Sequence, residues 1–322
     1  MTAISMPMQK KTVKRTAFCL MSLFLLALFL KNSEIAAKAI SSGLWLCVKT
    51  LLPSLFPLMV ASELLVESGI VQRVGRLLHR PFEALFGLRG DAACAVLLGF
   101  VCGFPVGTKC AAALWKSGDL DEQELCRTLA FSNQPSSAFL IYTVGGSMLG
   151  SVRLGLCLYL STLLSATALQ LLLRRWNSQT PKEGSAAPPP SARRSFSDAL
   201  AGAVSHSALA MLSICAFVVF FSSLVESLAH LANALSLSET GRALLFGFFE
   251  LTSGASCASR LSGSAATILC ALSVAWGGCS VHFQLLHLVG EAGFSHRAYF
   301  LMKLAQALLN IPILLLLWRW MG

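Results

Sequence analysis

The chain has 322 residues, of which 55% are hydrophobic and 12% are charged. Because soluble domains carry about 25% charged residues, this composition excludes an ordinary soluble protein and predicts a polytopic membrane protein. The net charge of +10 lies mostly in short basic clusters beside apolar segments, as in cytoplasmic loops, so we expect no nucleic-acid partner. The 11 cysteines lack the spacing of metal ligands, and we expect no metal and no cofactor.

Two apolar segments open the chain. Residues 17–30 follow a basic start and predict a first membrane span. Small residues at 37–39 resemble a cleavage site, so a signal peptide is the alternative. Residues 39–66 predict a second span, kinked by two prolines. A basic loop over residues 69–90 follows and ends in a short interfacial helix.

Residues 91–115 are apolar and long enough to cross a bilayer. They nevertheless contain Gly103, Pro105, Gly107 and Lys109. Proline removes a helical hydrogen bond, glycine loosens the helix, and a lysine inside the bilayer is costly unless it is paired or hydrated. The pattern predicts a broken transmembrane helix that lines a polar site, with the two glycines and the proline as a gate.

The next apolar segment, residues 121–149, is interrupted by the polar residues 132–137. Each half has about a dozen residues, which as helix is shorter than the roughly 30 Å of hydrocarbon, so we predict a re-entrant hairpin. Residues 152–173 predict a full span. The proline- and serine-rich residues 177–196 predict a flexible cytoplasmic linker.

The second half of the chain repeats these elements. Residues 197–228 and 243–259 predict spans, and residues 298–318 predict the last one. Residues 264–290 predict a second hairpin, because the apolar run is broken at residues 277–280.

Short matches recur in the same order in the two halves, for example Val66-Glu67-Ser68 with Val225-Glu226-Ser227. They predict two repeats. We therefore divide the chain into an N-terminal basic segment with the first span (1–36), a first repeat (37–176), the linker (177–196) and a second repeat (197–322).

The basic clusters predict the topology. They place the N-terminus, the 69–90 loop and the linker in the cytoplasm, and the acidic loop 116–127 outside. One apolar segment between that loop and the linker must then fail to cross, and the two repeats are inverted. We predict an all-α polytopic membrane protein with two inverted repeats, broken transmembrane helices and re-entrant hairpins, a design typical of secondary transporters.

Polar residues at the breaks are the candidate substrate-binding groups. Helix ends at such breaks present unpaired N–H groups, which suit carboxylate or phosphate groups, and a lysine would attract an anion. In the alternative interpretation the lysine reaches to the membrane interface and the other residues only satisfy the turns. The predicted substrate-binding residues are Lys109, Asn133, Gln134, Ser136, Ser137, Gly277, Gly278 and Ser280.

Four further residues are candidates for a gate or for ion coupling. Glu250 and Thr252 lie in the second-half segment that matches residues 91–115, and Glu250 could pair with Lys109 or bind a proton or cation. His282 and Gln284 follow the second break, where His282 could carry a proton. The alternatives are an interfacial glutamate and a buried structural histidine. No GxSxG, HExxH or P-loop motif occurs, so we expect no enzyme activity.

Four motifs, at residues 99–109, 129–135, 249–254 and 276–284, together resemble the YlbJ-type sporulation integral membrane proteins, which contain two Gate, or nucleoside-recognition, domains. The resemblance implies a fold related to concentrative nucleoside transporters. It also implies a role in spore formation and the movement of dipicolinic acid across the outer forespore membrane.

The resulting hypothesis is a transporter of a small organic anion, with dipicolinic acid the first candidate, that works by alternating access in the bacterial cell membrane. The partners expected are the lipid bilayer, the anion, a coupling proton or Na⁺, and a second copy of the chain in a homo-oligomer. Two alternatives stay open: a nucleoside permease, and a non-transporting scaffold for assembly of the spore envelope.

Overall fold

The computed structural model describes residues 6–68, 70–174, 195–233 and 236–321. Residues 177–194 of the predicted linker lie outside the described part. In chain order the elements are α1 (Met6–Lys31), α2 (Ser33–Leu46), the π-helix η1 (Cys47–Leu51), α3 (Leu52–Glu67), α4 (Ile70–Phe86), α5 (Ala92–Val101), α6 (Val106–Lys116), α7 (Glu122–Ser132), the π-helix η2 (Phe139–Met148), α8 (Val152–Arg174), α9 (Phe196–Asn233), α10 (Glu239–Phe249), α11 (Leu251–Ala258), α12 (Ser264–Trp276), α13 (Gly278–Val289) and α14 (His296–Met321).

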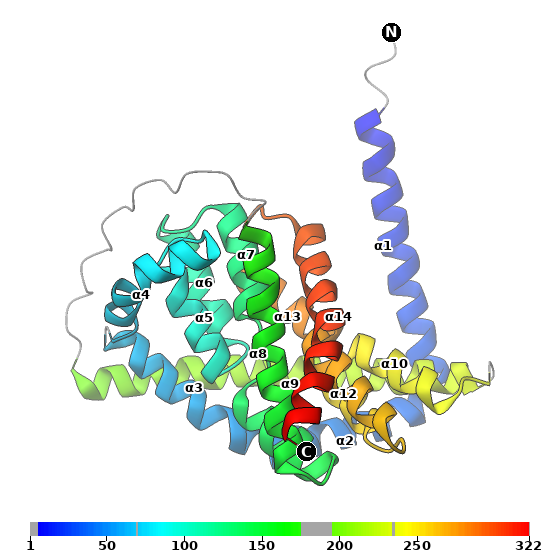
Figure 1. The fold of residues 1–322 in the computed structure, drawn as a ribbon. Helices are drawn as coiled ribbons and strands as arrows, with labels where there is room; N and C mark the ends of the chain where they lie inside the picture. The colour runs from blue at the N-terminus through cyan, green and yellow to red at the C-terminus, as the bar shows by residue number, and fades with distance from the viewer. Residues whose placement is uncertain (1–5, 69, 175–194, 234–235, 322) are drawn as a thin grey trace.

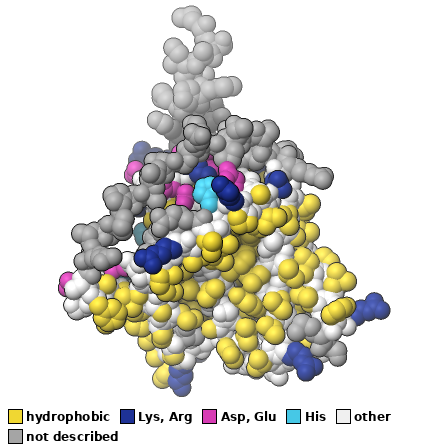
Figure 2. Space-filling view, turned by 60° about the vertical axis from the view of Figure 1, so that its left-hand side comes forward, with side chains coloured by type: hydrophobic (Ala, Val, Ile, Leu, Met, Phe, Trp, Pro, Cys, Tyr) yellow, Lys and Arg dark blue, Asp and Glu magenta, His cyan; other side chains and the backbone are white. Residues whose placement is uncertain are grey.

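The predicted class is confirmed, because the described residues form an all-α polytopic membrane protein. Within the described residues four helical stretches are long and apolar enough to cross a membrane. The pair Arg15–Lys31 and Ser33–Leu51, which is bent by 91° between α1 and α2, raises the number to as many as five if it forms one span. Figure 2 shows a broad apolar surface with basic, acidic and histidine side chains along its upper margin and scattered Lys or Arg side chains at its lower margin. Such a surface suits lipid rather than water.

The predicted break within residues 91–115 is present, but the prediction that this segment crosses the membrane is wrong. Helices α5 and α6 fold back on each other as a re-entrant hairpin, here called hairpin 1. Gly99 of α5 and Gly107 of α6 let the two backbones touch. A Cβ at Gly107 would lie 2.7 Å from the Cα of Gly99 and 2.9 Å from the carbonyl oxygen of Ala95. The glycines that looked like helix breakers are therefore the packing surface of the hairpin.

Residues 243–259 are corrected in the same way. They were predicted as the second-half counterpart of the broken span at residues 91–115, but α10 and α11 form a second re-entrant hairpin, hairpin 2. A Cβ at Gly254 would meet the Cα and the N–H of Gly247. The two hairpins therefore use the same glycine-to-glycine contact.

Conversely, the two predicted hairpins at residues 121–149 and 264–290 are broken spans. Residues 264–289 qualify together as one membrane-crossing stretch, which we call broken span 2. In broken span 1 (α7 and η2), the start of α7 lies near the start of α14, since Gly293 N donates to Glu122 Oε1 at 3.1 Å. The end of η2, at Met148, instead lines a cavity that is also lined by Glu239, Arg260 and residues near the start of α2. The two halves of that element thus continue across the molecule instead of returning.

The molecule has two loop faces. The α4 face carries the ends of α4 and α8 and the starts of α7 and α14, and the α2 face carries the start of α2, the end of η2 and the base of hairpin 2. The predicted separation of loop 69–90 from loop 116–127 is wrong, because Arg89 Nη1 donates to the carbonyl oxygen of Asp119 at 2.7 Å. A hairpin must return to the face from which it enters, so both loops lie on the α4 face.

The two halves share one order of elements: a long helix, a hairpin, a broken span and a full span (Figure 1). The long helix of the first half, α2 to α3, runs antiparallel to α9, since Gly43 packs on Val219 and Gly202 lies near Glu67. α9 has 38 residues and is about 57 Å long. It crosses the molecule at a steep angle to α8 and α14 (Figure 1). Hairpin 1 enters from the α4 face and hairpin 2 from the α2 face, as inverted repeats require.

Candidate functional site

A cavity of about 70 Å³, the central cavity, lies where the four interrupted elements meet. Hairpin 1 contributes its tip at Phe104, and hairpin 2 contributes its tip at Glu250 and Thr252. α3 and α9 close it with apolar side chains such as Leu55 and Val218. The two broken spans supply the remaining polar walls, namely Asn133, Gln134 and Ser136 from the first and Gly277, Ser280 and Gln284 from the second.

The break in broken span 1 is held against the tip of hairpin 1. Phe104 N donates to the carbonyl oxygen of Gln134 at 2.7 Å. Gly103 has a positive φ of 77°, and a Cβ there would strike the backbone of Ser136. Ser137 Oγ donates to the carbonyl oxygen of Val101 at 3.1 Å. The backbone N–H and C=O groups that lose their helical partners at the two breaks therefore form hydrogen bonds with groups of the other break.

The break in broken span 2 rests on two glycines. Gly277 and Gly278 have φ values of 92° and 77°, a region that L-residues with side chains rarely adopt. A Cβ at Gly278 would lie 2.9 Å from the N–H of Leu251 at the tip of hairpin 2. Beyond the break, Gln284 Nε2 donates to Ser280 Oγ at 3.2 Å, which aims both side chains into one cavity wall.

Glu250 forms the N-cap of α11 at the tip of hairpin 2. Its carboxylate accepts the N–H of Thr252 at 2.9 Å and the N–H of Ser253 at 2.6 Å. Its side chain is buried, so these bonds and the positive end of the helix compensate for the loss of water. The predicted gate residue is thus placed at the cavity, with a helix-capping contact that the sequence interpretation did not include.

Four helices begin beside the central cavity, namely α6, η2, α11 and α13. Their first N–H groups lack helical partners and carry partial positive charge. Glu250 offsets the charge at α11, and at the start of η2 the N–H of Phe139 donates to Ser136 Oγ at 3.3 Å. The remaining helix starts favour negative or hydrogen-bond-accepting groups in the cavity.

A polar stripe on α14 forms the layer behind the cavity, and the sequence interpretation missed it. Lys303 is 1% exposed. Its Nζ donates to the carbonyl oxygen of Asn133 at 2.9 Å and to Gln306 Oε1 at 2.8 Å. Gln306 Nε2 in turn donates to Gln134 Oε1 at 2.8 Å. Within the described residues no carboxylate lies at ion-pair distance from Lys303, so this buried lysine is held by neutral groups alone.

One hydroxyl group links the two broken spans. Asn133 Nδ2 donates to Tyr299 Oη at 2.7 Å, and His282 Nδ1 lies 2.9 Å from the same oxygen. All three side chains are buried. Among the described residues, Asn133 Oδ1, Gln284 Oε1 and His282 Nε2 have no hydrogen-bond partner. Buried polar atoms without partners are rare in folded proteins, so the site has unused hydrogen-bonding capacity.

Lys109 lies away from the central cavity. Its Nζ is 3.0 Å from Glu63 Oε1, and the two side chains are 28% and 24% exposed. A lysine in a membrane segment is stabilised by such a partner, so the pairing accounts for the position of Lys109 without a substrate. The structure places the other predicted substrate-binding residues at the central cavity or in the breaks that border it. Their part in binding stays a prediction.

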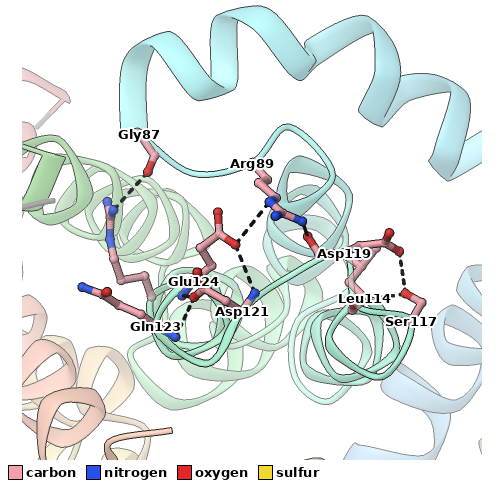
Figure 3. A network of polar contacts seen from close by, with 9 residues as sticks. Gly87, Arg89, Leu114, Ser117, Asp119, Asp121, Gln123 and Glu124 are labelled. Carbon is pink, nitrogen blue, oxygen red and sulfur yellow. Dashed lines mark hydrogen bonds and ion pairs between the residues drawn. The ribbon is translucent and has the colours of Figure 1, made fainter. Parts of the chain in front are cut away.

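A second polar cluster fastens the base of hairpin 1 on the α4 face (Figure 3). Arg89 reaches between the carbonyl oxygen of Asp119 and the carboxylate of Glu124, 3.5 Å from its Nε. Arg127 Nη2 donates to the carbonyl oxygen of Phe86 at 2.8 Å. Burial, with the neighbouring Asp119, raises the pKa of Asp91 beside this cluster. We call the contacts of Arg89 and Arg127 the hairpin 1 latch.

Comparison with known proteins agrees with this fold class. The family described as Gate, nucleoside recognition, matches residues 48–152, which lie within the predicted first repeat. The sporulation integral membrane protein YlbJ of Bacillus subtilis (strain 168) is 26% identical over 330 residues, covering 92% of this chain and 81% of that protein. No solved structure matches the chain. The chain is therefore an integral membrane protein that is similar to YlbJ over most of its length, and its first half contains a region that matches the Gate family.

Proposed function

We propose that this chain transports a small organic anion by alternating access and binds the anion at the central cavity. The observation that carries the proposal is the meeting of two re-entrant hairpins and two broken spans around one cavity, where polar groups of the breaks lie among apolar side chains. Interrupted helices are tolerated at membrane depth only where they line a cavity or are buried in protein. A purely structural membrane protein would have no use for four such interruptions at one point.

The charges near the cavity support an anion. Lys303 lies directly behind Asn133, without a carboxylate partner among the described residues, and the starts of α6 and α13 add partial positive charge. A cavity of about 70 Å³ is small beside the few hundred Å³ of typical ligand pockets. A hairpin tip must therefore move away from the breaks to admit an organic molecule.

Similarity to a sporulation integral membrane protein makes dipicolinic acid, an aromatic dianion, the first substrate to test. The corresponding location is the outer forespore membrane of a sporulating cell. A coupling proton or Na⁺ and a homo-oligomer belong to the same proposal, and imposed ion gradients test the coupling.

A nucleoside is the second candidate substrate. The cavity wall carries neutral amides and hydroxyls, and Asn133 Oδ1 and Gln284 Oε1 lack partners among the described residues. Such acceptors suit the hydroxyl and N–H groups of a nucleoside, and the matched family is described by nucleoside recognition.

The test is uptake of labelled dipicolinate, other dicarboxylates and uridine into proteoliposomes, with protein-free liposomes as the background. We expect uptake of dipicolinate, and a loss of about tenfold or more in Lys303→Gln, because about 1.4 kcal/mol of lost attraction is a tenfold effect. Lys109→Gln is the matched control and should retain most of the uptake. If Lys109 binds the substrate as the sequence predicts, the order of the two variants is reversed.

Each variant is first compared with the wild type by elution profile and thermal unfolding in detergent. Uptake of uridine in place of dipicolinate supports the nucleoside permease. No uptake of any compound by folded wild-type protein, with and without a proton or Na⁺ gradient, rejects transport and supports the scaffold.

A further inference from the structure

A second cavity of about 620 Å³ lies on the α2 face, between hairpin 2 on one side and α2 with α9 on the other. The wall of this second cavity carries several charged side chains, and in this respect it differs from the wall of the central cavity. α2 contributes Lys38, α9 contributes Glu226, and hairpin 2 contributes Glu239, Arg242 and Arg260.

The tip of hairpin 2 separates the two cavities. Thr252 lines both of them, and Ser253 lines the second cavity. The polar contacts of hairpin 2 to other elements run towards broken span 2, where Trp276 Nε1 donates to the carbonyl oxygen of Phe248 at 3.0 Å. The opposite side of the hairpin borders the second cavity. A displacement of this tip into the second cavity would therefore join the two cavities.

The side chains of Arg242 and Arg260 form no hydrogen bond or ion pair within the described part of the chain. Lys38, by contrast, is paired with Glu34 at 2.8 Å. Glu226 and Glu239 also line the cavity without a contact to either arginine at ion-pair distance. The planar guanidinium group presents several N–H donors that match a carboxylate or phosphate, so these two arginines are available to an anion in the cavity.

We propose that the second cavity is the access chamber for the anion on the α2 face, and that Arg242 and Arg260 select anionic substrates there before they pass the tip of hairpin 2. This inference rests on the proposed transport function, and it names the route and the selecting residues. An anionic lipid headgroup shares the chemistry of the substrate and is the competing source of an anion.

Cys257 provides a built-in reporter. It lines the second cavity, is half-buried, and lies within electrostatic range of both arginines and both glutamates. We would measure its reaction, in detergent, with two methanethiosulfonates of similar size, the anionic sulfonatoethyl and the cationic trimethylammonioethyl reagent. The signal of Cys257→Ser is subtracted, which removes the reactions of the other cysteines.

Replacing Arg242 and Arg260 together by glutamine should lower the ratio of the anionic to the cationic rate at least about fivefold. Replacing Glu226 and Glu239 by glutamine, a charge change of equal size, should raise it. Dipicolinate should slow the reaction in the wild type and not in the double arginine variant. An unchanged ratio, or a Cys257 that neither reagent reaches, overturns the inference.

Two further experiments distinguish a lipid headgroup from dipicolinate as the bound anion, and failure of the access chamber from failure of the transport function. If micelles containing phosphatidylglycerol protect Cys257 while dipicolinate does not, the cavity holds lipid and the access chamber is rejected. In proteoliposomes, Arg242→Gln with Arg260→Gln should raise KM for the anion and leave the maximal rate within about twofold. Wild-type uptake with an unchanged KM in the variant rejects the access chamber alone. If wild-type protein shows no uptake although Cys257 reacts with the two reagents as predicted, the transport function alone is rejected.

Discussion

Hairpin 1 and hairpin 2 are built alike, each from two short helices that touch through a pair of glycines, but their bases are held differently. The base of hairpin 1 is fastened by the hairpin 1 latch. Arg89 donates to the carbonyl oxygen of Asp119 and forms an ion pair with Glu124 of α7, and Arg127 of α7 donates to the carbonyl oxygen of Phe86 at the end of α4. The base of hairpin 2 borders the second cavity, where the side chains of Arg242 and Arg260 have no hydrogen-bond or ion-pair partner within the described residues.

The same contrast holds at the tips. Hairpin 1 gives and receives backbone-directed hydrogen bonds across broken span 1, through Phe104 with Gln134 and Ser137 with Val101. Hairpin 2 caps itself, because Glu250 accepts the N–H groups of its own next turn. Its tip accepts one hydrogen bond from broken span 2, from Trp276 Nε1 to the carbonyl oxygen of Phe248, and this bond lies at an exposed position, so its loss leaves no buried group unpaired. We infer that hairpin 2 is the mobile gate and hairpin 1 the fixed one.

The largest expected effect on stability tests the glycine-to-glycine contact that the two hairpins share. Gly107→Val and Gly254→Val place a side chain into the backbone of the facing helix, and each should lower the free energy of unfolding by at least about 3 kcal/mol. Thermal unfolding and the yield of monodisperse protein in detergent measure this. Gly241→Ala is the control, because the nearest atom to its Cβ would be Ser238 Oγ at 3.4 Å. A stable Gly254→Val would show that hairpin 2 does not depend on this contact.

The latch itself should give the next largest effect. Arg89→Gln removes the charged donor to Asp119 and the ion pair with Glu124, whose side chains are only 12% and 11% exposed. We expect a loss of about 2–3 kcal/mol, measured as a lower midpoint of thermal unfolding. Hydrogen exchange should also accelerate in residues 87–91 and 117–121.

Lys38→Gln is the matched control for the latch, because it breaks an ion pair on the α2 face whose side chains are 76% and 82% exposed. It should cost no more than about 0.5 kcal/mol. Equal losses in the two variants would show that the base of hairpin 1 is held no more firmly than an exposed ion pair.

The smallest effect concerns the tip of hairpin 2. Glu250→Gln keeps one acceptor for the N–H groups of α11 but removes the negative charge, and should cost about 1 kcal/mol. Glu250→Ala removes both acceptors and should cost up to about 2 kcal/mol. Hydrogen exchange at Thr252 and Ser253 reports the change directly. A Glu250→Ala variant with unchanged exchange would mean that the cap does not hold the tip.

Sequence patterns located the breaks correctly but misjudged the path of the chain between them. In the first half, for example, the residues near Gly103 and those at 132–137 were both recognised as interruptions of apolar runs. Which of the two turns back could not be predicted, because each is flanked by apolar helices of similar length. The decision depends on whether the flanking helices pack on each other, as Gly99 and Gly107 allow.

The site was predicted in part for a similar reason. Asn133, Gln134 and Glu250 stood out because they are polar residues at interruptions, and all three border the central cavity. Lys303 lies inside an uninterrupted apolar helix and was missed. One signal was available, since Tyr299, Lys303, Gln306 and Asn310 recur at spacings of three and four and so share one face of α14.

The amino-acid sequence by itself determined the membrane class, the positions of the four interruptions and the likeness of the two halves, because these follow from local composition and periodicity. Only the tertiary structure decided which interruptions became hairpins, that Lys109 pairs with Glu63 and that Lys303 stands behind Asn133. The reason is that each of these depends on contacts between residues far apart in the chain, and the spacing of neighbouring residues does not identify the partners in such contacts.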